Sequence, residues 1–354
     1  MYQLSTKKIT NLFVFLLVCF TVSTQAQNLT GMVRNTSGQP VKYALIAHSN
    51  NTSIYTKTDV NGAFSIPGTT ATVLKVAALK YATIPNYIAT STSGIIITMQ
   101  PDPLLATDVF HISFDHLRPG PTYTKNEMKN DFSLAYTSGF YEGTPDTDRA
   151  SVDYNVSRDQ GGVSLKVRFP QGKLKTADSG VDTRIDLAGT FNTNNFQSED
   201  LYLSYWVKFS DNFEFNKCGG KLPSLGGSTV NSTQDRWKGR IMWRNGGAIQ
   251  FYMELPDNSF SADNDTRFWG PVAVPTTSSD ICDLRYQPYL GSPGWHNIEL
   301  HYKFETPGMN DGLFEGWVDG ANYESINASV FNNYRPAGTT RENITINTIL
   351  LSAF

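Results

Sequence analysis

The chain has 354 residues, of which 29 are basic, 32 are acidic and 17% in all are charged. This slightly acidic balance offers no basic surface for nucleic acid or for an anionic membrane, and so excludes both as primary partners. The length exceeds what one small core supports and predicts two domains of unequal size.

Residues 1–26 are typical of an export signal. Lys7 and Lys8 precede an apolar run, Leu12 to Val22, that is too short to span a bilayer. A small-residue cleavage site follows and ends at Ala26. We therefore expect these residues to be removed during export.

Cleavage near Gln27 leaves 27 basic and 32 acidic residues, a net charge of about −5. Cys19 leaves open the alternative of a lipid anchor, although it follows Val18 rather than a small residue. The mature chain has no further apolar segment long enough for a membrane span. We expect an exported monomer that is periplasmic, outer-membrane-associated or extracellular.

Residues 27–101 predict a small β-sandwich of the immunoglobulin or prealbumin type. Short β-prone runs such as "LTGMVRN" and "GIIITMQ" are separated by the turns "TSGQP" and "VNGAF". The run that contains "TDVNGAFSIP" resembles the carboxypeptidase-regulatory-like domain of exported Bacteroidetes proteins. The resemblance implies a spacer or docking module, with ligand binding as the alternative.

Residues 107–354 predict a large jelly-roll β-sandwich, which makes the whole chain all-β. The linker "QPDPLLATD" precedes this part, and its two prolines break any strand across it. Apolar residues alternate with polar ones along Val163–Phe169, Leu201–Phe209 and Ile298–Phe304. The best candidate for a short helix is "KNEMKNDF", residues 125–132.

Two predicted strands carry an unusual polar face. In "GRIMWRN", Ile241 and Trp243 alternate with Arg240, Met242 and Arg244. In "GAIQFYMELPD", the polar positions are Gln250, Tyr252 and Glu254. The short turn "NGG" between these runs predicts that they pair, which would place arginines, a tyrosine and a carboxylate on one surface. An ordinary solvated sheet face is the alternative.

The cysteines and histidines indicate no metal or cofactor. Cys218 and Cys282 remain after cleavage and could form a disulfide in an oxidising compartment or stay as two thiols. The histidines have no metal-ligand spacing. No phosphate loop, nucleophile elbow or dinucleotide fingerprint is present.

Residues 107–354 resemble the polysaccharide lyase family 14 domain, a jelly roll whose characterised members cleave alginate or glucuronan. The resemblance rests on four blocks in order: "YWVKFSDNFEFNKCGGKLPSLGG", "GRIMWRNGGAIQFYMELPD", "GWHNIELHYKFETPGMNDGLFEGWVDG" and "INTILLSAF". It implies β-elimination, in which a base removes the C5 proton of a uronate and the O4 glycosidic oxygen departs. The expected partner is an acidic polysaccharide.

The resemblance also implies catalytic roles for Lys221, Arg240 and Tyr252. Lys221 lies in the glycine-flanked stretch "GGKLPSLGG", which we expect to be a loop at the rim of a groove, where the glycines let a sugar chain approach. Lys221 and Arg240 would neutralise the uronate carboxylate and stabilise the enolate-like transition state. Tyr252 would transfer protons, because cations nearby lower the pKa of a tyrosine from about 10.

This sequence departs from the family pattern at Glu254, where the family has a second tyrosine, and at Lys238, where it has a serine. Glu254 could retune the reaction or disable it. With Glu254 and Lys238, the expected substrate-binding residues are Arg244, Gln250 and His301, although a lone histidine on the polar side of a strand is more often a surface residue.

Two alternatives to a lyase remain. The jelly roll could be a non-catalytic carbohydrate-binding protein that has lost the chemistry at Glu254, or the chain could be a surface adhesion protein. Because the sequence stops inside a predicted strand, "TILLSAF", it could also be truncated at its C-terminus.

Overall fold

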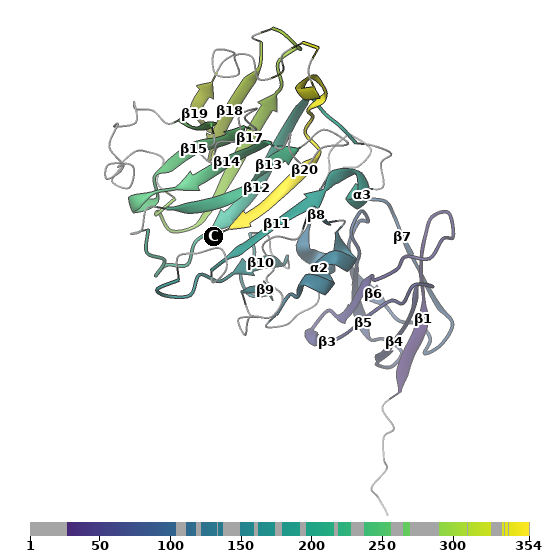
Figure 1. Cartoon of the computed structure of the whole chain (residues 1–354). Coiled ribbons are helices and arrows are strands. Elements are labelled where there is room, and N and C mark those ends of the chain that lie inside the picture. The colour runs from purple at the N-terminus through teal and green to yellow at the C-terminus, as the bar shows by residue number, and fades with distance from the viewer. Residues whose placement is uncertain are drawn as a thin grey trace, which may run out of the picture. The chain divides into compact units, whose positions relative to one another are not determined.

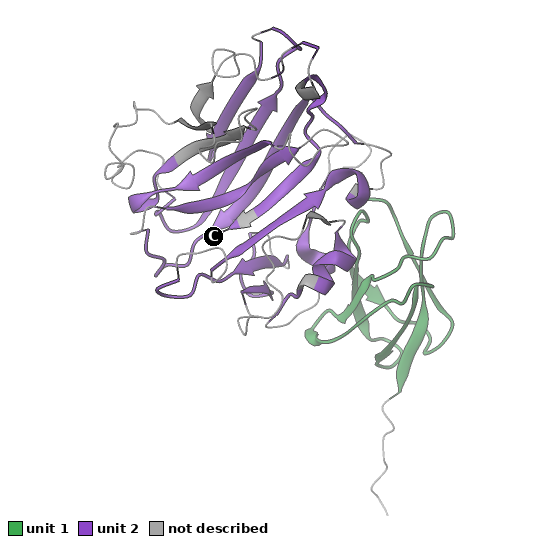
Figure 2. Cartoon of the chain, viewed as in Figure 1, with its two compact units in different colours: residues 1–107 green, residues 108–354 purple. Residues whose placement is uncertain are grey.

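The computed structural model describes residues 27–103, 111–117, 122–132, 134–136, 149–158, 162–173, 179–191, 196–215, 219–227, 237–255, 265–269, 290–309, 311–326, 335, 337–338 and 340–353. The chain divides into two compact units, residues 1–107 and 108–354 (Figure 2). Along the described residues, no helix is long and apolar enough to cross a bilayer.

The smaller unit is a β-sandwich of two short sheets, which confirms the predicted fold (Figure 1). One sheet has the order β4-β1-β7 and the other β3-β2-β5-β6. Apolar residues at alternate positions, among them Leu29, Ile46 and Ile97, are fully or almost fully buried between the sheets. The strands are β1 (Asn28–Asn35), β2 (Leu45–His48), β3 (Asn51–Lys57), β4 (Ala63–Pro67), β5 (Val73–Ala77), β6 (Ile84–Ile88) and β7 (Ile95–Met99).

The larger unit is a jelly-roll β-sandwich, as predicted, whose two main sheets have the orders β16-β15-β14-β13-β20-β11-β8 and β12-β17-β18-β19 (Figure 1). A separate pair joins β9 to β10. The strands are β8 (Leu134–Tyr136), β9 (Ala150–Asp153), β10 (Ser164–Val167), β11 (Val181–Asp186), β12 (Asp200–Lys208), β13 (Gly220–Gly227), β14 (Trp237–Trp243), β15 (Ile249–Leu255), β16 (Asp265–Trp269), β17 (Trp295–Lys303), β18 (Leu313–Val318), β19 (Ala321–Ile326) and β20 (Thr348–Ala353).

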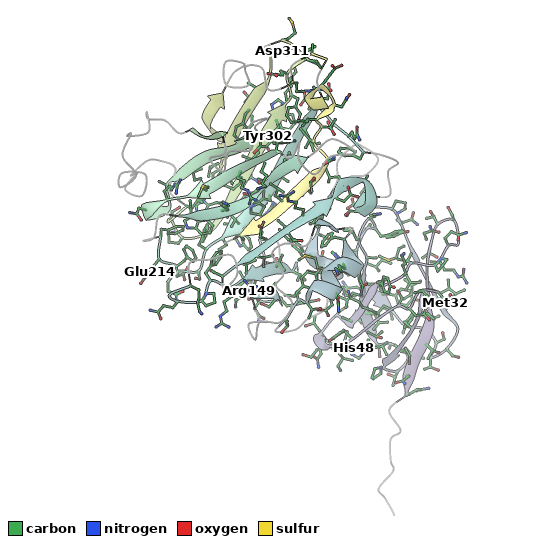
Figure 3. The ribbon with its side chains drawn as sticks, viewed as in Figure 1. Met32, His48, Arg149, Glu214, Tyr302 and Asp311 are labelled. Carbon is green, nitrogen blue, oxygen red and sulfur yellow. The ribbon has the colours of Figure 1, made fainter. Side chains whose placement is uncertain are left out.

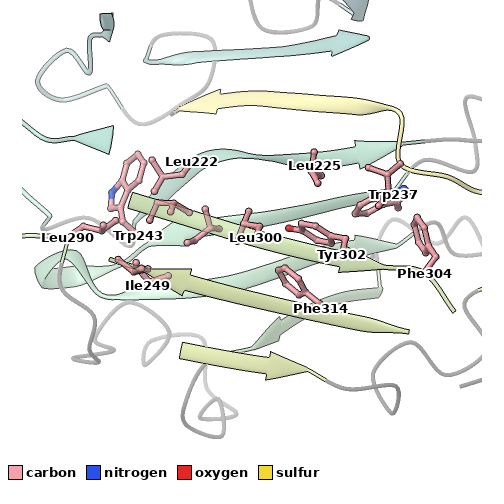
Figure 4. Packing of buried hydrophobic residues seen from close by; sticks show 14 of the residues in the cluster. Leu222, Leu225, Trp237, Trp243, Ile249, Leu290, Leu300, Tyr302, Phe304 and Phe314 are labelled. Atoms are coloured by element: carbon pink, nitrogen blue, oxygen red, sulfur yellow. The ribbon is translucent and has the colours of Figure 1, made fainter. Parts of the chain in front are cut away.

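The core of the larger unit lies between the seven-stranded and four-stranded sheets (Figure 4). Trp237, Ile241 and Trp243 enter it from β14, and Leu300 and Tyr302 enter it from β17. Their neighbours along each strand therefore point away from the core, because side chains alternate along a strand. This alternation confirms the predicted inward positions of Ile241 and Trp243.

Among its described residues, the larger unit has two short α-helices beside its sheets. Helix α2 (Lys125–Asp131) matches the predicted helix, and Thr124 and Glu127 form a capping box at its start. Helix α3 (Leu187–Phe191) directly follows β11 and was not predicted, because five residues are too few for a helical pattern.

The stretch "GGKLPSLGG" is a strand, not the loop that its flanking glycines predicted. Residues Gly220–Gly227 form β13, in the interior of the seven-stranded sheet between β14 and β20. The pairing with β14 shifts register between Leu222 and Leu225, so Pro223 lies at the irregularity. A proline is tolerated there because the ladder is already interrupted.

Candidate functional site

The candidate site is built on the face of β13, β14 and β15 that is turned away from the core. Lys221 lies directly opposite Met242, and Arg240 lies directly opposite Tyr252. Arg240 is two residues from Met242 on β14, so Lys221 and Arg240 are diagonal neighbours on the sheet. Residues in this relation usually lie about 7–8 Å apart. Three adjacent strands bring together the three residues predicted to be catalytic.

The turn between β14 and β15 confirms the predicted pairing. Asn245–Gly247 form a single 3-10 turn, in which Gly246 has a φ of 68° and Gly247 a φ of 81°. Both values lie in the left-handed region that glycine adopts without steric cost. The chain therefore reverses at once, and β15 returns antiparallel to β14.

Arg240 is almost entirely buried, with 3% of its surface exposed. Its Nη1 atom lies 3.9 Å from Oδ1 of Asp182 on β11. A charge in such surroundings acts over a longer distance than one in water, because the local dielectric is low. Arg240 is therefore a buried guanidinium that is paired with a carboxylate of the same sheet.

The other cations of this face differ in their accessibility. Lys221 and Lys238 are partly exposed, whereas Arg244 is buried, with 5% of its surface exposed. Lys238 lies opposite Glu254 on β15 and opposite Gly226 on β13. Lys221 is therefore better placed than either arginine to contact a bound anion.

The glycines beside Lys221 serve the packing of the strands. Gly219 has a φ of 90°, and a Cβ atom there would lie 1.7 Å from the carbonyl oxygen of Trp243. A Cβ atom at Gly227 would lie 1.9 Å from the carbonyl oxygen of Thr345. Only glycine, which has no Cβ atom, lets the backbone of residues 219–227 lie this close to those two carbonyl groups. The prediction that glycines make room for a sugar chain is corrected for these two positions.

Asp182 is the site residue that sequence analysis missed. It lies 58 positions before Arg240 along the chain, and the pairing of β20 with both β11 and β13 brings the two strands into one sheet. A weak signal was present, because Asp182, Arg184 and Asp186 alternate with the buried Val181, Thr183 and Ile185. That pattern predicts a polar face on this strand, but it does not predict that Asp182 pairs with Arg240.

His301 does not join this group, contrary to the prediction. It lies on β17, whose core-facing residues Leu300 and Tyr302 flank it, so its ring is on the outer face of the four-stranded sheet. Its Nδ1 atom is 2.9 Å from Glu315, and its Nε2 atom is 2.7 Å from Asp200. The core of the sandwich separates this histidine from Lys221.

Several predicted residues are only partly described or lie outside the described residues. Gln250, Tyr252 and Glu254 have defined positions in β15, but their side chains are not described. Cys218 and Cys282, the disulfide candidates, lie outside the described residues. Within the described part of the chain, no cluster of three or more His, Cys, Asp or Glu residues could hold a metal ion.

This arrangement can bind an anion and stabilise negative charge that develops beside it. Lys221 is a cationic residue that is partly exposed, and Arg240 adds a buried guanidinium on the residue paired with Tyr252. Fixed cations of this kind favour a transition state that is more anionic than its ground state.

Comparisons with known proteins found several similar solved structures. A solved alginate lyase of family PL-14 from Aplysia kurodai is 18% identical, with a TM-score of 0.43, covering 67% of this chain and 87% of its own. An alginate lyase from Chlorella virus is 18% identical, with a TM-score of 0.38, covering 59% and 85%. An endo-β-1,4-glucuronan lyase from Trichoderma reesei is 14% identical, with a TM-score of 0.37, covering 62% and 79%.

No curated protein matches the chain. The profile of the family polysaccharide lyase 14 matches residues 157–354, which is more than half of the sequence and includes β13, β14 and β15. The chain belongs to the polysaccharide lyase 14 family.

Proposed function

We propose that the protein is an exported polysaccharide lyase that cleaves a uronate polymer, of the alginate or glucuronan type, by β-elimination. The observation that carries this proposal is the juxtaposition of Lys221, Arg240 and Tyr252 on three adjacent strands inside the family-matched segment. Membership of the family supports the type of reaction, a lyase reaction on a polysaccharide. The cationic residues of the sheet face support an anionic sugar chain as the substrate.

In the proposed reaction, the C5–H bond breaks first and its electrons form an enolate with the uronate carboxylate. Lys221 binds that carboxylate, and Arg240 adds positive potential from within the sheet. The C4–O4 bond then breaks as the C4–C5 double bond forms, and a proton is delivered to O4. Tyr252 carries out the proton transfer, with its phenolate favoured by the guanidinium opposite.

The two departures from the family pattern lie opposite each other across the sheet. Lys238 and Glu254 occupy directly paired positions of β14 and β15. Oppositely charged residues at paired positions stabilise each other. We infer that Lys238 offsets the charge of Glu254, so that this carboxylate does not repel a polyuronate.

We also propose that residues 1–26 direct export, to the periplasm, the outer membrane or the medium. The smaller unit would serve as a docking module of the carboxypeptidase-regulatory-like type. The apolar run after Lys7 and Lys8 supports export. The β-sandwich fold of the smaller unit supports the docking module. Fractionation of cells that produce the full chain, with and without residues 1–26, tests it.

Incubation of the mature protein with polymannuronate, polyguluronate and glucuronan separately tests the activity. We expect ultraviolet absorbance of the unsaturated product to rise with at least one polymer. Binding of a polymer by folded protein without any rise would instead favour the carbohydrate-binding alternative.

Two variants test the residue assignment. Tyr252→Phe and Lys221→Ala should each lower turnover by about 100-fold or more, since each removes a group that acts in the transition state. Lys208→Ala is the matched control, because Lys208 is an exposed cation on the other sheet. Retention of full activity in Tyr252→Phe would refute its role in proton transfer.

A further inference from the structure

A second group of functional residue types lies on the outer face of the four-stranded sheet, across the core from Lys221. Leu201, Leu203 and Tyr205 pack on the core from β12, so Tyr202 and Trp206 point outward. They are 58% and 43% exposed, although both are large and partly apolar. Exposed aromatic residues that gather on one face are typical of binding surfaces.

Tyr202 is held flat by the histidine beneath it. Its ring stacks on that of His301 with the ring centroids 3.9 Å apart and the planes inclined by 3°. His301 is itself 6% exposed and is fixed at both ring nitrogens, by Glu315 and by Asp200. The imidazole therefore cannot turn, and the opposite face of the Tyr202 ring is presented to solvent in a defined orientation.

Two tryptophans extend this surface. Trp206 lies four residues from Tyr202 along β12, roughly 13 Å away at the usual rise per residue. The guanidinium carbon of Arg158 lies 4.3 Å from the centroid of its ring. Trp317, partly exposed on β18, lies opposite Glu299 and points outward, because Phe314 and Val318 of that strand face the core. We call Tyr202, Trp206 and Trp317 the aromatic platform.

Carboxylates lie close to the Tyr202 ring of the aromatic platform. Desolvation, together with the charges of Asp200, Glu315 and Glu299, raises the pKa of the Tyr202 hydroxyl. Carboxylate oxygens are strong acceptors for hydroxyl donors. They also repel other carboxylates, which distinguishes the surroundings of Tyr202 from those of Lys221.

We propose that the aromatic platform is a second saccharide site, which binds an uncharged glycan rather than a uronate polymer. The apolar C–H face of a sugar ring packs on the electron-rich face of an aromatic ring, and its hydroxyls donate to the carboxylates beside it. The spacing of Tyr202 and Trp206 matches the length of a short oligosaccharide. This site is independent of the proposed lyase reaction.

Charge complementarity favours this occupant over a polyuronate. Asp200 and Glu315 already contact His301, but their remaining oxygens and those of Glu299 can accept from sugar hydroxyls, whereas they would repel a uronate at the Tyr202 ring. The rigid support of Tyr202 also favours binding, because a ring that is already oriented loses little entropy when a ligand packs on it.

Affinity electrophoresis of the full mature chain tests the proposal. The gels would contain hydroxyethylcellulose, galactomannan, pullulan or polymannuronate. We expect at least one neutral polymer to retard the protein, and Tyr202→Ala and Trp206→Ala each to weaken that retardation by about tenfold. Tyr202→Phe, which keeps the ring, should retain most of the binding.

Met309→Ala is the matched control, because Met309 is also 58% exposed but lies in the turn after β17 rather than on a strand of the sheet. Its binding should equal that of the unaltered protein, and every variant should retain one cooperative thermal unfolding transition. The proposal is overturned if no neutral polymer retards the protein, if only polymannuronate does, or if both alanine variants bind normally. A change of oligomeric state in Tyr202→Ala without any loss of glycan binding would also overturn it, in favour of a second copy of the chain.

Discussion

Tyr302 shows how burial separates residues of the same type into different roles. It lies in the core from β17, 2% exposed, and is labelled in Figure 3. Burial, and secondarily Tyr205 nearby, raise the pKa of Tyr302 well above its usual value, although the charge of Arg240 acts in the opposite direction. A phenol that stays protonated at any ordinary pH cannot act as a base, so Tyr302 is not a rival to Tyr252.

Tyr302→Phe should therefore leave turnover unchanged. Among the described residues the hydroxyl of Tyr302 has no hydrogen-bond partner, so its removal should raise the free energy of unfolding by about 1 kcal/mol. Urea unfolding at neutral pH and the absorbance assay measure these two effects. Loss of activity with an intact fold would contradict the assignment.

The same substitution should change the response of stability to alkaline pH. The unfolded chain ionises its tyrosines near pH 10, whereas the pKa of Tyr302 in the folded state is higher. Its contribution to stability is thus complete below about pH 10 and is lost as the pH rises, by roughly 1.4 kcal/mol per unit. In Tyr302→Phe, the free energy of unfolding should fall less steeply at alkaline pH, because the loss due to Tyr302 is absent. Urea unfolding of both proteins at a series of alkaline pH values would detect the difference.

At the scale of elements, β14 connects the core to the candidate site. Its core-facing residues are Trp237, Gly239, Ile241 and Trp243, and its other face carries Arg240. Gly239 has no side chain, and the ring of Tyr302 from the opposite sheet occupies that space. A Cβ atom at Gly239 would lie 2.2 Å from a carbon of that ring.

Gly239→Ala should lower the free energy of unfolding by about 1–3 kcal/mol, because the added methyl group overpacks the core. The loss should be smaller when Tyr302 is already alanine, since the truncated side chain leaves room for the methyl group. Urea unfolding of the two single variants and the double variant measures this coupling. Equal losses in both backgrounds would show that Tyr302 is not the obstacle.

At the scale of the whole molecule, the two units have separate cores. The core of the smaller unit is formed by residues between Leu29 and Met99, and that of the larger unit by residues between Phe169 and Ile349. The two sets of buried residues do not overlap. Each unit therefore contains the apolar burial that it needs for its own stability.

We predict that residues 27–103 and residues 111–354 each fold when produced separately. Each fragment should unfold in one cooperative transition, and the lyase activity should belong to the larger one, which contains the family-matched segment. Circular dichroism during urea unfolding, with the activity assay, tests both statements. A fragment without a cooperative transition would show that its core depends on the other unit.

The sequence by itself determined the all-β class, the alternating strands, the β14–β15 hairpin and the family of the larger unit. These follow from local rules, because strand alternation and turn glycines act over a few residues. The glycines of residues 219–227 led these rules to a wrong prediction of a loop, because the conformation of this segment depends on neighbouring strands that are distant in the sequence.

Only the tertiary structure decided which polar residues meet. Asp182 reaches Arg240 through the placement of β20 between β11 and β13, and His301 is carried to the far side of the core by the four-stranded sheet. Both outcomes depend on pairings between strands that lie far apart in sequence. Side-chain alternation predicts that a residue faces outward, but the order of strands in the sheets determines which surface it joins.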